Sequence, residues 1–198
     1  MLDRFIAALT GRRLGGALFV LLGVIVAAVV LWPDGGDDDA AAPKIQPVRI
    51  VSVPELGLAF AHPRAWRRTV ARRAIRLRSP DRAAVLTFAS PVRGPHTRQV
   101  LADLKGELRR RFAGTKVVRE GPAKLARYLG RSLELDDVGA DASMRVLIVV
   151  ASSRHRTYAV TLLTPARPSA TRLAEVQRIL ATVRLTKPTR KPVVASNG

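Results

Sequence analysis

Apolar and polar residues alternate in several segments of the chain after residue 47, and this is the pattern of half-buried β-strands. In "AIRLRS", Ile75 and Leu77 alternate with arginines, and "AAVLTFA" follows the turn "SPDR", so we expect a β-hairpin there. Further extended segments are expected at 48–53, 57–63, 115–120, 124–136, 144–152 and 156–164. The last two are joined by the short turn "SRHR" and should pair as a central hairpin.

Two later segments change from the strand period to a helical period. The first, residues 96–114, carries an apolar stripe whose main members recur every four residues. The stripe consists of Val100, Leu101, Leu104, Leu108 and Phe112. Thr97 is expected to cap the start of this helix and Gly114 to mark its end.

A second helix is expected to begin near Pro168. Its inner face is expected to consist of Leu173, Val176, Leu180 and Val183. Strands and helices are thus segregated along the chain with short links between them, which predicts the α+β class. We expect an antiparallel sheet flanked by helices, an αβα sandwich, over residues 48–185.

The chain before this domain contains an uncharged apolar run from Leu14 to Trp32. As a helix rising about 1.5 Å per residue, the run would span roughly 28 Å, close to the thickness of a bilayer's hydrocarbon core. We therefore predict one transmembrane helix over 14–32, with Trp32 at the interface and Pro33 after its end. A cleaved signal peptide, cut near "AAAP" at 40–43, is the alternative, but its apolar core is usually shorter.

Basic residues near the apolar run predict its orientation. Arginines stand at three positions within residues 1–13, whereas Lys44 and Arg49 are the nearest cations on the other side. This asymmetry favours a cytoplasmic N-terminus and an extracytoplasmic C-terminal domain at the cell membrane. The expected organisation is a cytoplasmic segment 1–13, the transmembrane helix 14–32, an acidic flexible linker 33–47, the α+β domain 48–185 and a disordered basic tail 186–198.

The chain has a net charge of +19 and no cysteine. The lack of cysteine excludes disulfides, thiolate metal sites and cysteine nucleophiles. The charge predicts a positive field and anionic partners, such as lipid headgroups, cell-wall polymer, nucleic acid or an acidic protein. A compositional bias toward arginine is the alternative explanation for part of this charge. The candidate residues for binding an anionic surface are Arg67, Arg68, Arg72, Arg73, Arg109, Arg110 and Arg111.

The sequence contains no arrangement typical of an active site or a metal centre. His62, His96 and His155 are scattered, and none has a second histidine or a carboxylate at ligand spacing. Ser152 and Ser153 lie beside His155 in one turn, whereas a catalytic triad needs residues that converge from different elements. We therefore expect no catalytic residue, no metal and no cofactor.

The densest acidic segment, "ELDDVGADAS", is partly similar to a calcium-binding loop. Asp136, Asp137 and Asp141 surround Gly139, but the later bidentate glutamate of such a loop is missing. A glycine-containing turn between two strands explains the segment without a metal.

The segment "LAFAHPRAW" resembles the F-x-x-P-x-x-W start of many domains in the PsbP-like superfamily, named for an extrinsic subunit of photosystem II. Phe60, Pro63 and Trp66 carry this resemblance, and "YLGRSLEL" and "YAVTLLTPA…LAEVQRILATVRL" extend it over most of residues 50–185. The resemblance implies an αβα sandwich without a shared catalytic constellation. Bacterial members are often exported lipoproteins or membrane-tethered domains; this chain has no cysteine to lipidate, and the predicted span would replace that anchor.

These features predict a membrane-anchored, extracytoplasmic, non-enzymatic binding or accessory domain that associates with anionic lipid or cell-wall polymer. Nucleic acid or another soluble polyanion is the alternative partner, because attraction to phosphates does not depend on sequence. Single-strand binders expose stacking aromatics, however, and Phe88, Phe112, Tyr128 and Tyr158 fall within apolar patterns. A hydrolase is the third and least supported interpretation, and no specific protein partner is predicted.

Overall fold

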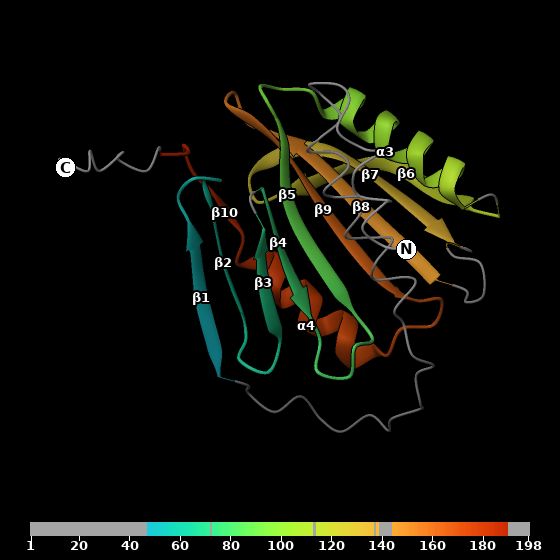
Figure 1. Cartoon of the computed structure of the whole chain (residues 1–198), viewed down its shortest axis with the longest axis horizontal. Helices are drawn as coiled ribbons and strands as arrows, with labels where there is room; N and C mark the ends of the chain where they lie inside the picture. The colour runs from blue at the N-terminus through green and yellow to red at the C-terminus, as the bar shows by residue number, and fades with distance from the viewer. Residues whose placement is uncertain (1–46, 72, 113, 137, 139–143, 190–198) are drawn as a thin grey trace, which may run out of the picture.

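Figure 1 shows a computed structural model of the chain, which describes residues 47–71, 73–112, 114–136, 138 and 144–189. The strands are β1 Val48–Val53, β2 Leu58–Pro63, β3 Arg67–Ala71, β4 Ala74–Arg78, β5 Val85–Arg93, β6 Lys116–Leu125, β7 Tyr128–Asp136, β8 Met144–Ser152, β9 Arg156–Pro165 and β10 Arg184–Leu185. The helices are α3 Thr97–Arg111 and α4 Ala170–Ala181.

Seven of the described strands form one antiparallel sheet in the order β3-β4-β5-β9-β8-β7-β6, and β1, β2 and β10 form a smaller sheet. β8 and β9 pair along their whole length, which confirms the predicted central hairpin. β4 and β5 form the hairpin expected on either side of "SPDR". The predicted α+β class, with an antiparallel sheet and two helices, is therefore confirmed for the described residues.

The two faces of the large sheet have separate cores. α3 lies against β7, β8 and β9, and its Leu104 and Leu108 pack with Ile148 in the first core. The second core joins the other face to α4 and the small sheet, and in it the rings of Phe60 and Phe88 stack with their centroids 4.6 Å apart. The central strands serve both cores because successive residues of a strand point to opposite faces.

The ends of α3 differ from the prediction. Thr97 is the first helical residue, and His96 occupies the N-cap without a side-chain cap hydrogen bond. The Thr97 hydroxyl instead lies 2.6 Å from a hydroxyl of β8, so a tertiary contact takes the place of the expected cap. The helix ends at Arg111 with Phe112 as its C-cap, before the predicted Gly114.

α4 buries one residue that its apolar pattern does not indicate. The pattern places Leu173 on the inner face, but this side chain is 37% exposed. Glu175 is buried instead, beside Val176, with 6% of its surface exposed. Val183 is buried as expected, but it follows the end of the helix. A carboxylate can face the core only where donors meet it, and Glu175 is met by Trp66 and by Arg172.

The strands that depart from expectation are the exposed or short ones. In β3 all five residues are exposed, so no apolar alternation marks it in the sequence. β6 and β7 divide the single run expected at 124–136, because the chain reverses at Ala126, where φ is +53°. β6 continues through Pro122, which an edge strand tolerates on its unpaired side. β10 has only two residues and pairs with β2.

The predicted cytoplasmic segment, transmembrane helix and nearly all of the acidic linker lie outside the described residues. Within the described part of the chain, no helix has the length and apolar character needed to cross a membrane. Of the tail expected at 186–198, the structure describes residues 186–189. There the amides of Thr186 and Thr189 donate to the carbonyl oxygens of Gly57 and Pro54, at 2.8 and 3.0 Å.

Candidate functional site

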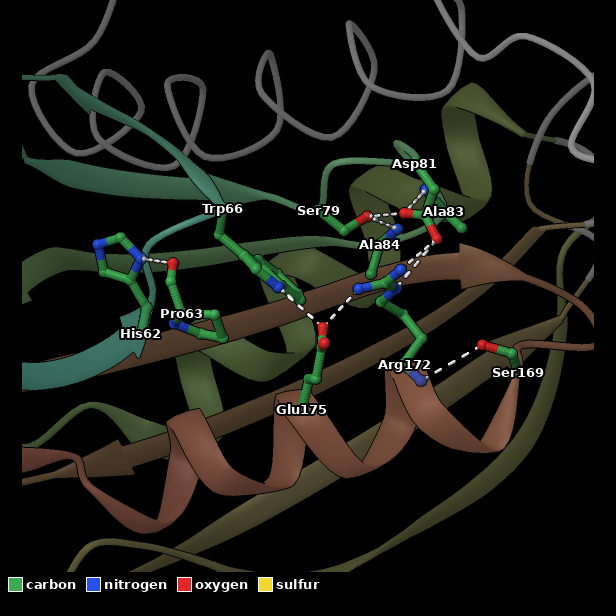
Figure 2. Close-up of polar contacts among 10 residues, drawn as sticks. All are labelled: His62, Pro63, Trp66, Ser79, Asp81, Ala83, Ala84, Ser169, Arg172 and Glu175. Atoms are coloured by element: carbon green, nitrogen blue, oxygen red, sulfur yellow. Dashed lines mark hydrogen bonds and ion pairs between the residues drawn. The ribbon is translucent and has the colours of Figure 1, made fainter. Parts of the chain in front are cut away.

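A polar cluster, buried at Trp66 and Glu175 and exposed at Asp81, links α4 to the β2–β3 and β4–β5 turns, as Figure 2 shows. The indole N–H of Trp66 donates to Oε2 of Glu175 at 2.9 Å, and the Arg172 guanidinium binds the same oxygen. Arg172 also donates through Nε to Oδ2 of Asp81, in the β4–β5 turn, at 3.1 Å. These donors explain why α4 turns a carboxylate toward the core.

Asp81 is held within the β4–β5 turn by two further hydrogen bonds. The Ser79 hydroxyl donates to its Oδ1 at 2.5 Å, and the Ala83 amide donates to the same oxygen at 3.0 Å. Burial raises the pKa of Asp81, but the hydrogen bonds from Ser79, Ala83 and Arg172 outweigh burial and leave that pKa below its ordinary value. The hydrogen bonds of this cluster join residues of the fold to one another, so we assign the cluster a structural role.

The structure places the predicted surface arginines at separate locations. Arg67 and Arg68 are exposed on β3, an edge strand of the large sheet. Arg73 lies in the turn at the other end of the β3–β4 hairpin. Arg72 lies outside the described residues.

The remaining predicted arginines, Arg109, Arg110 and Arg111, form the last turn of α3. Glu107 forms ion pairs with Arg110 and with Arg111, the latter at 2.9 Å. Burial raises the pKa of Glu107, but the two arginines lower it overall. Part of the positive charge is thus balanced locally, and cations also suit a helix C-terminus because of the helix dipole.

Strand register gathers a set of cations at one end of the large sheet, and Arg73 is the one member of this set that the sequence also indicates. Arg93 pairs with Arg156 across β5 and β9, and the Ser90 amide donates to the Arg73 carbonyl oxygen at 3.1 Å. The β6–β7 turn adjoins the β8–β9 turn, because β7 and β8 are paired up to this end. We call this region the cationic end; it comprises Arg73, Arg93, Arg127, Arg154, Arg156 and Lys187.

The like charges of the cationic end are close enough to influence one another. Burial lowers the pKa of the Arg156 guanidinium; Tyr158 opposes this effect, and Arg93 and Arg73 add to it. Among the described residues, no member of the cationic end forms an ion pair with a carboxylate. One described carboxylate, Glu55, lies in the β1–β2 turn, to which the chain on both sides of Lys187 is hydrogen-bonded. The region should therefore project a positive potential.

A pocket of about 310 Å³ opens at the cationic end. It lies between the β6–β7 turn, the β8–β9 turn and the residues that follow β10. Its lining consists of Arg127, Tyr128, Ser153, Arg154, His155, Leu185, Thr186 and Lys187. This lining includes no carboxylate, so the pocket has the same sign of charge as the surface around it.

Sequence inspection does not single out this end because its cations are dispersed. The predicted group depends on runs of neighbouring arginines, as at residues 109–111, whereas the cationic end takes single residues from several turns and strand ends. The available signal is that Arg154 and Arg156 flank His155 in an expected hairpin turn. Strand order is needed to place Arg73 and Arg127 beside them.

The residues considered for catalysis make contacts within the fold. The Ser153 hydroxyl accepts from the Arg156 amide at 3.1 Å and closes the β8–β9 turn, and the Ser152 hydroxyl contacts hydroxyls of β9 and α3. His62 is buried, and its Nδ1–H donates to the Pro63 carbonyl oxygen at 2.8 Å. The part of the chain that the structure describes contains no group of three or more potential metal ligands.

The acidic segment is described in part. Asp136 accepts two hydrogen bonds from Arg145, at 2.7 and 3.0 Å, across the start of the β7–β8 connection. Asp137, Gly139 and Asp141 lie outside the described residues.

Comparison with known proteins gives structural neighbours only. No protein-family model and no curated protein sequence matches the chain. The solution structure of cyanobacterial PsbP (CyanoP) from Synechocystis sp. PCC 6803 is similar, with a TM-score of 0.56 and 12% identity over 75% of this chain and 98% of that one. A crystal structure from Bacteroides thetaiotaomicron has a TM-score of 0.51 and 12% identity over 74% of this chain. The match covers 49% of that protein, so the chain spans about half its length.

The residues that carry the resemblance in sequence are core residues in the structure. Phe60 and Trp66 are each 2% exposed, which confirms the expectation that they fill the core. Pro63 ends β2, and its carbonyl oxygen accepts the Trp66 amide at 3.1 Å, so the proline stands at a turn as expected. Together with the similarity to cyanobacterial PsbP, this arrangement shows that the described domain has a PsbP-like fold.

Proposed function

We propose that the chain is a membrane-anchored, extracytoplasmic binding module without catalytic activity, whose cationic end holds it against phosphate-bearing surfaces of the cell envelope. The observation that carries this proposal is the cationic end, where six basic residues lie along one end of the fold without an ion pair to a described carboxylate. Attraction between exposed charges acts over about 8–10 Å at physiological salt. A surface with many phosphates, such as anionic lipid or cell-wall polymer, suits a cluster of this kind.

The predicted anchor and linker would keep the domain close to such a surface. A flexible linker of about 15 residues has a root-mean-square span of roughly 20 Å. The domain, whose first strand begins at Val48, would then stay within reach of the headgroups of the membrane that holds it. The expected orientation, with the N-terminus in the cytoplasm, puts the domain on the outer side.

Nucleic acid is less well supported as a partner. Binders of single strands use exposed aromatic rings as stacking platforms. Phe88 and Tyr158 are 1% and 3% exposed, and Phe112 is partly buried against the first core. Tyr128 is partly buried, and the Arg127 guanidinium lies 5.4 Å from its ring centroid, so one face of that ring is already in use.

Co-flotation tests the binding proposal on the full chain. The chain is held in nanodiscs of zwitterionic lipid and mixed with separate vesicles that either contain or lack phosphatidylglycerol. We expect it to float with the anionic vesicles only, and binding should weaken at least about tenfold as salt screens the exposed charges. Failure to float with anionic vesicles at the lowest salt would overturn the proposal.

A reporter fusion tests the location. Alkaline phosphatase fused after Gly198 folds into an active enzyme only outside the cytoplasm, so we expect active fusions. Inactive phosphatase, together with activity of a cytoplasmic reporter at the same position, would place the domain inside the cell.

A further inference from the structure

The pocket at the cationic end has the lining of a site for a single ligand group. Three of its side chains are basic, namely Arg127, Arg154 and Lys187. We propose that this pocket recognises one phosphate group carried on a small polar alcohol. The inference rests on the proposed function, and it names the chemistry that the same surface selects.

Arg127 is held in position by its neighbour. Its guanidinium lies over the Tyr128 ring, 5.4 Å from the centroid, and donates to the Tyr128 hydroxyl at 3.3 Å. Tyr128 packs against the second core, so the ring is a firm support. A guanidinium fixed in this way loses little side-chain freedom when it binds an anion, which favours specific recognition.

Lys187 is brought to the pocket by the backbone after β10. The Thr186 amide donates to the Gly57 carbonyl oxygen, and the Thr189 amide to that of Pro54, so the chain on both sides of Lys187 is fastened to the β1–β2 turn. Gly57 permits this contact, because a Cβ at its position would lie 2.3 Å from the Thr186 carbonyl oxygen. Lys187 is therefore placed by a fixed segment of backbone.

The β8–β9 turn supplies the third wall of the pocket. The Ser153 hydroxyl accepts from the amides of His155 and Arg156, at 3.2 and 3.1 Å, which fixes the course of the turn. The His155 carbonyl oxygen accepts the Gly94 amide at 2.9 Å and ties the turn to the end of β5. Arg154 and His155 are both exposed between these anchored points and face solvent at the pocket.

The charge and the size of the pocket together indicate the ligand class. Guanidinium groups bind phosphate through two parallel N–H donors, and an ammonium adds a point charge. A volume of about 310 Å³ is at the lower end of the range of small-molecule sites, about 300–1,000 Å³. Such a pocket has room for a phosphate and a short polar body, as in glycerol phosphate. This unit occurs free, in lipid headgroups and in phosphate-linked polymers.

Calorimetric titration of the full chain in nonionic micelles with glycerol 3-phosphate tests the inference. We expect one molecule bound per chain, competition by inorganic phosphate, and no competition by glycerol. Replacing Arg127 and Lys187 by glutamine should weaken binding at least about tenfold, since each removes a charged hydrogen-bond donor. The matched control replaces Arg73 and Arg93, which belong to the cationic end but not to the pocket lining, and should weaken binding less than about threefold.

A charge-conserving variant separates recognition from bulk attraction. Arg127→Lys keeps the charge but loses the two-pronged donor, so it should still weaken glycerol 3-phosphate binding by about threefold or more. Absence of binding to the unmodified chain, or equal losses in the pocket and control variants, would overturn the inference.

Co-flotation then distinguishes the two proposals. If anionic vesicles bind the chain while glycerol 3-phosphate does not, the pocket inference fails and the proposed function stands. If glycerol 3-phosphate binds in the pocket but vesicles and phosphate polymer do not bind, the pocket stands and the proposed function fails. The source of the phosphate follows from comparing phosphatidylglycerol vesicles with poly(glycerol phosphate). Whichever of these two carriers is the physiological source of the phosphate should bind the Arg127, Lys187 double variant more weakly than it binds the Arg73, Arg93 control.

Discussion

Trp66 and Glu175 are 109 residues apart in the sequence, yet one hydrogen bond of 2.9 Å joins them in the core. A buried indole N–H without an acceptor costs free energy, as does a buried carboxylate without donors. Arg172, one turn earlier on α4, provides a donor for the Glu175 carboxylate. The tryptophan that carries the family resemblance is thus not only an apolar core residue, because its N–H also donates to the carboxylate that α4 turns inward.

The first prediction concerns this contact. Glu175→Ala leaves the Trp66 N–H and part of the Arg172 guanidinium without their acceptor, and should lower the free energy of unfolding by about 2–4 kcal/mol. Gln177→Ala, on the exposed side of the same helix, should change it by less than about 0.5 kcal/mol. Urea unfolding of the full chain, followed by tryptophan fluorescence, measures both. Equal midpoints for the two variants would show that the contact does not stabilise the fold.

The second prediction concerns pH. Burial lowers the pKa of His62 from its ordinary value of 6.5; the hydrogen bond to Pro63 raises it, and Arg68 and Arg49 lower it again, leaving it below 6.5. The unfolded chain then takes up the proton more readily than the folded chain, so stability is complete above about pH 6.5 and declines as the pH falls through the folded-state value.

His62→Asn should flatten this part of the stability profile, because asparagine keeps a donor for the Pro63 carbonyl oxygen but does not titrate. His155→Gln, at an exposed histidine, is the control and should leave the slope as it is in the unmodified chain. The test is to measure the free energy of unfolding of both variants and of the unmodified chain from about pH 8 to about pH 5. An unchanged slope in His62→Asn would assign the pH dependence to another group.

Among the elements, those with one buried face can be predicted from the sequence. Ile75 and Leu77 alternate with arginines in β4, and the stripe from Val100 to Leu108 marks α3, because burial selects residues at the period of the element. β3 escapes prediction because every one of its residues is exposed, and β10 because two residues carry no period. The reversal at Ala126 is hidden because the strands on both sides of it continue the extended pattern.

The third prediction concerns the approach of β7 to β8. A Cβ on Gly130 would lie 2.1 Å from the Val150 carbonyl oxygen, a backbone atom that can move only if the strand shifts. Gly130→Ala should therefore lower the free energy of unfolding by about 3 kcal/mol. Gly121→Ala, in β6, is the matched control; no atom lies within 4 Å of its added Cβ, and the change should be below about 1 kcal/mol. Similar unfolding midpoints for the two variants would contradict the described register.

At the scale of the whole molecule, the candidate site depends on strand order. The +19 charge predicts anionic partners from the sequence alone, but the location of the charge does not follow from runs of arginine. Arg110 and Arg111 are paired with Glu107, whereas Arg93 and Arg156 come together only because β5 pairs with β9. That pairing joins residues 63 or more positions apart, and local patterns do not specify it. The hydrogen bond from the Thr157 hydroxyl to the Gly94 carbonyl oxygen spans the same separation of 63 positions.

The measurement that tests the central claim most directly compares two triple variants of equal charge in the vesicle co-flotation assay. One replaces Arg73, Arg93 and Arg154 at the cationic end with glutamine, and the other replaces the three arginines at 109–111. Each cation near an anionic surface contributes about 1 kcal/mol, so the first variant should lose roughly a hundredfold in vesicle affinity. The second should lose less than about threefold. Equal losses, or a larger loss in the second variant, would contradict the assignment of binding to the cationic end.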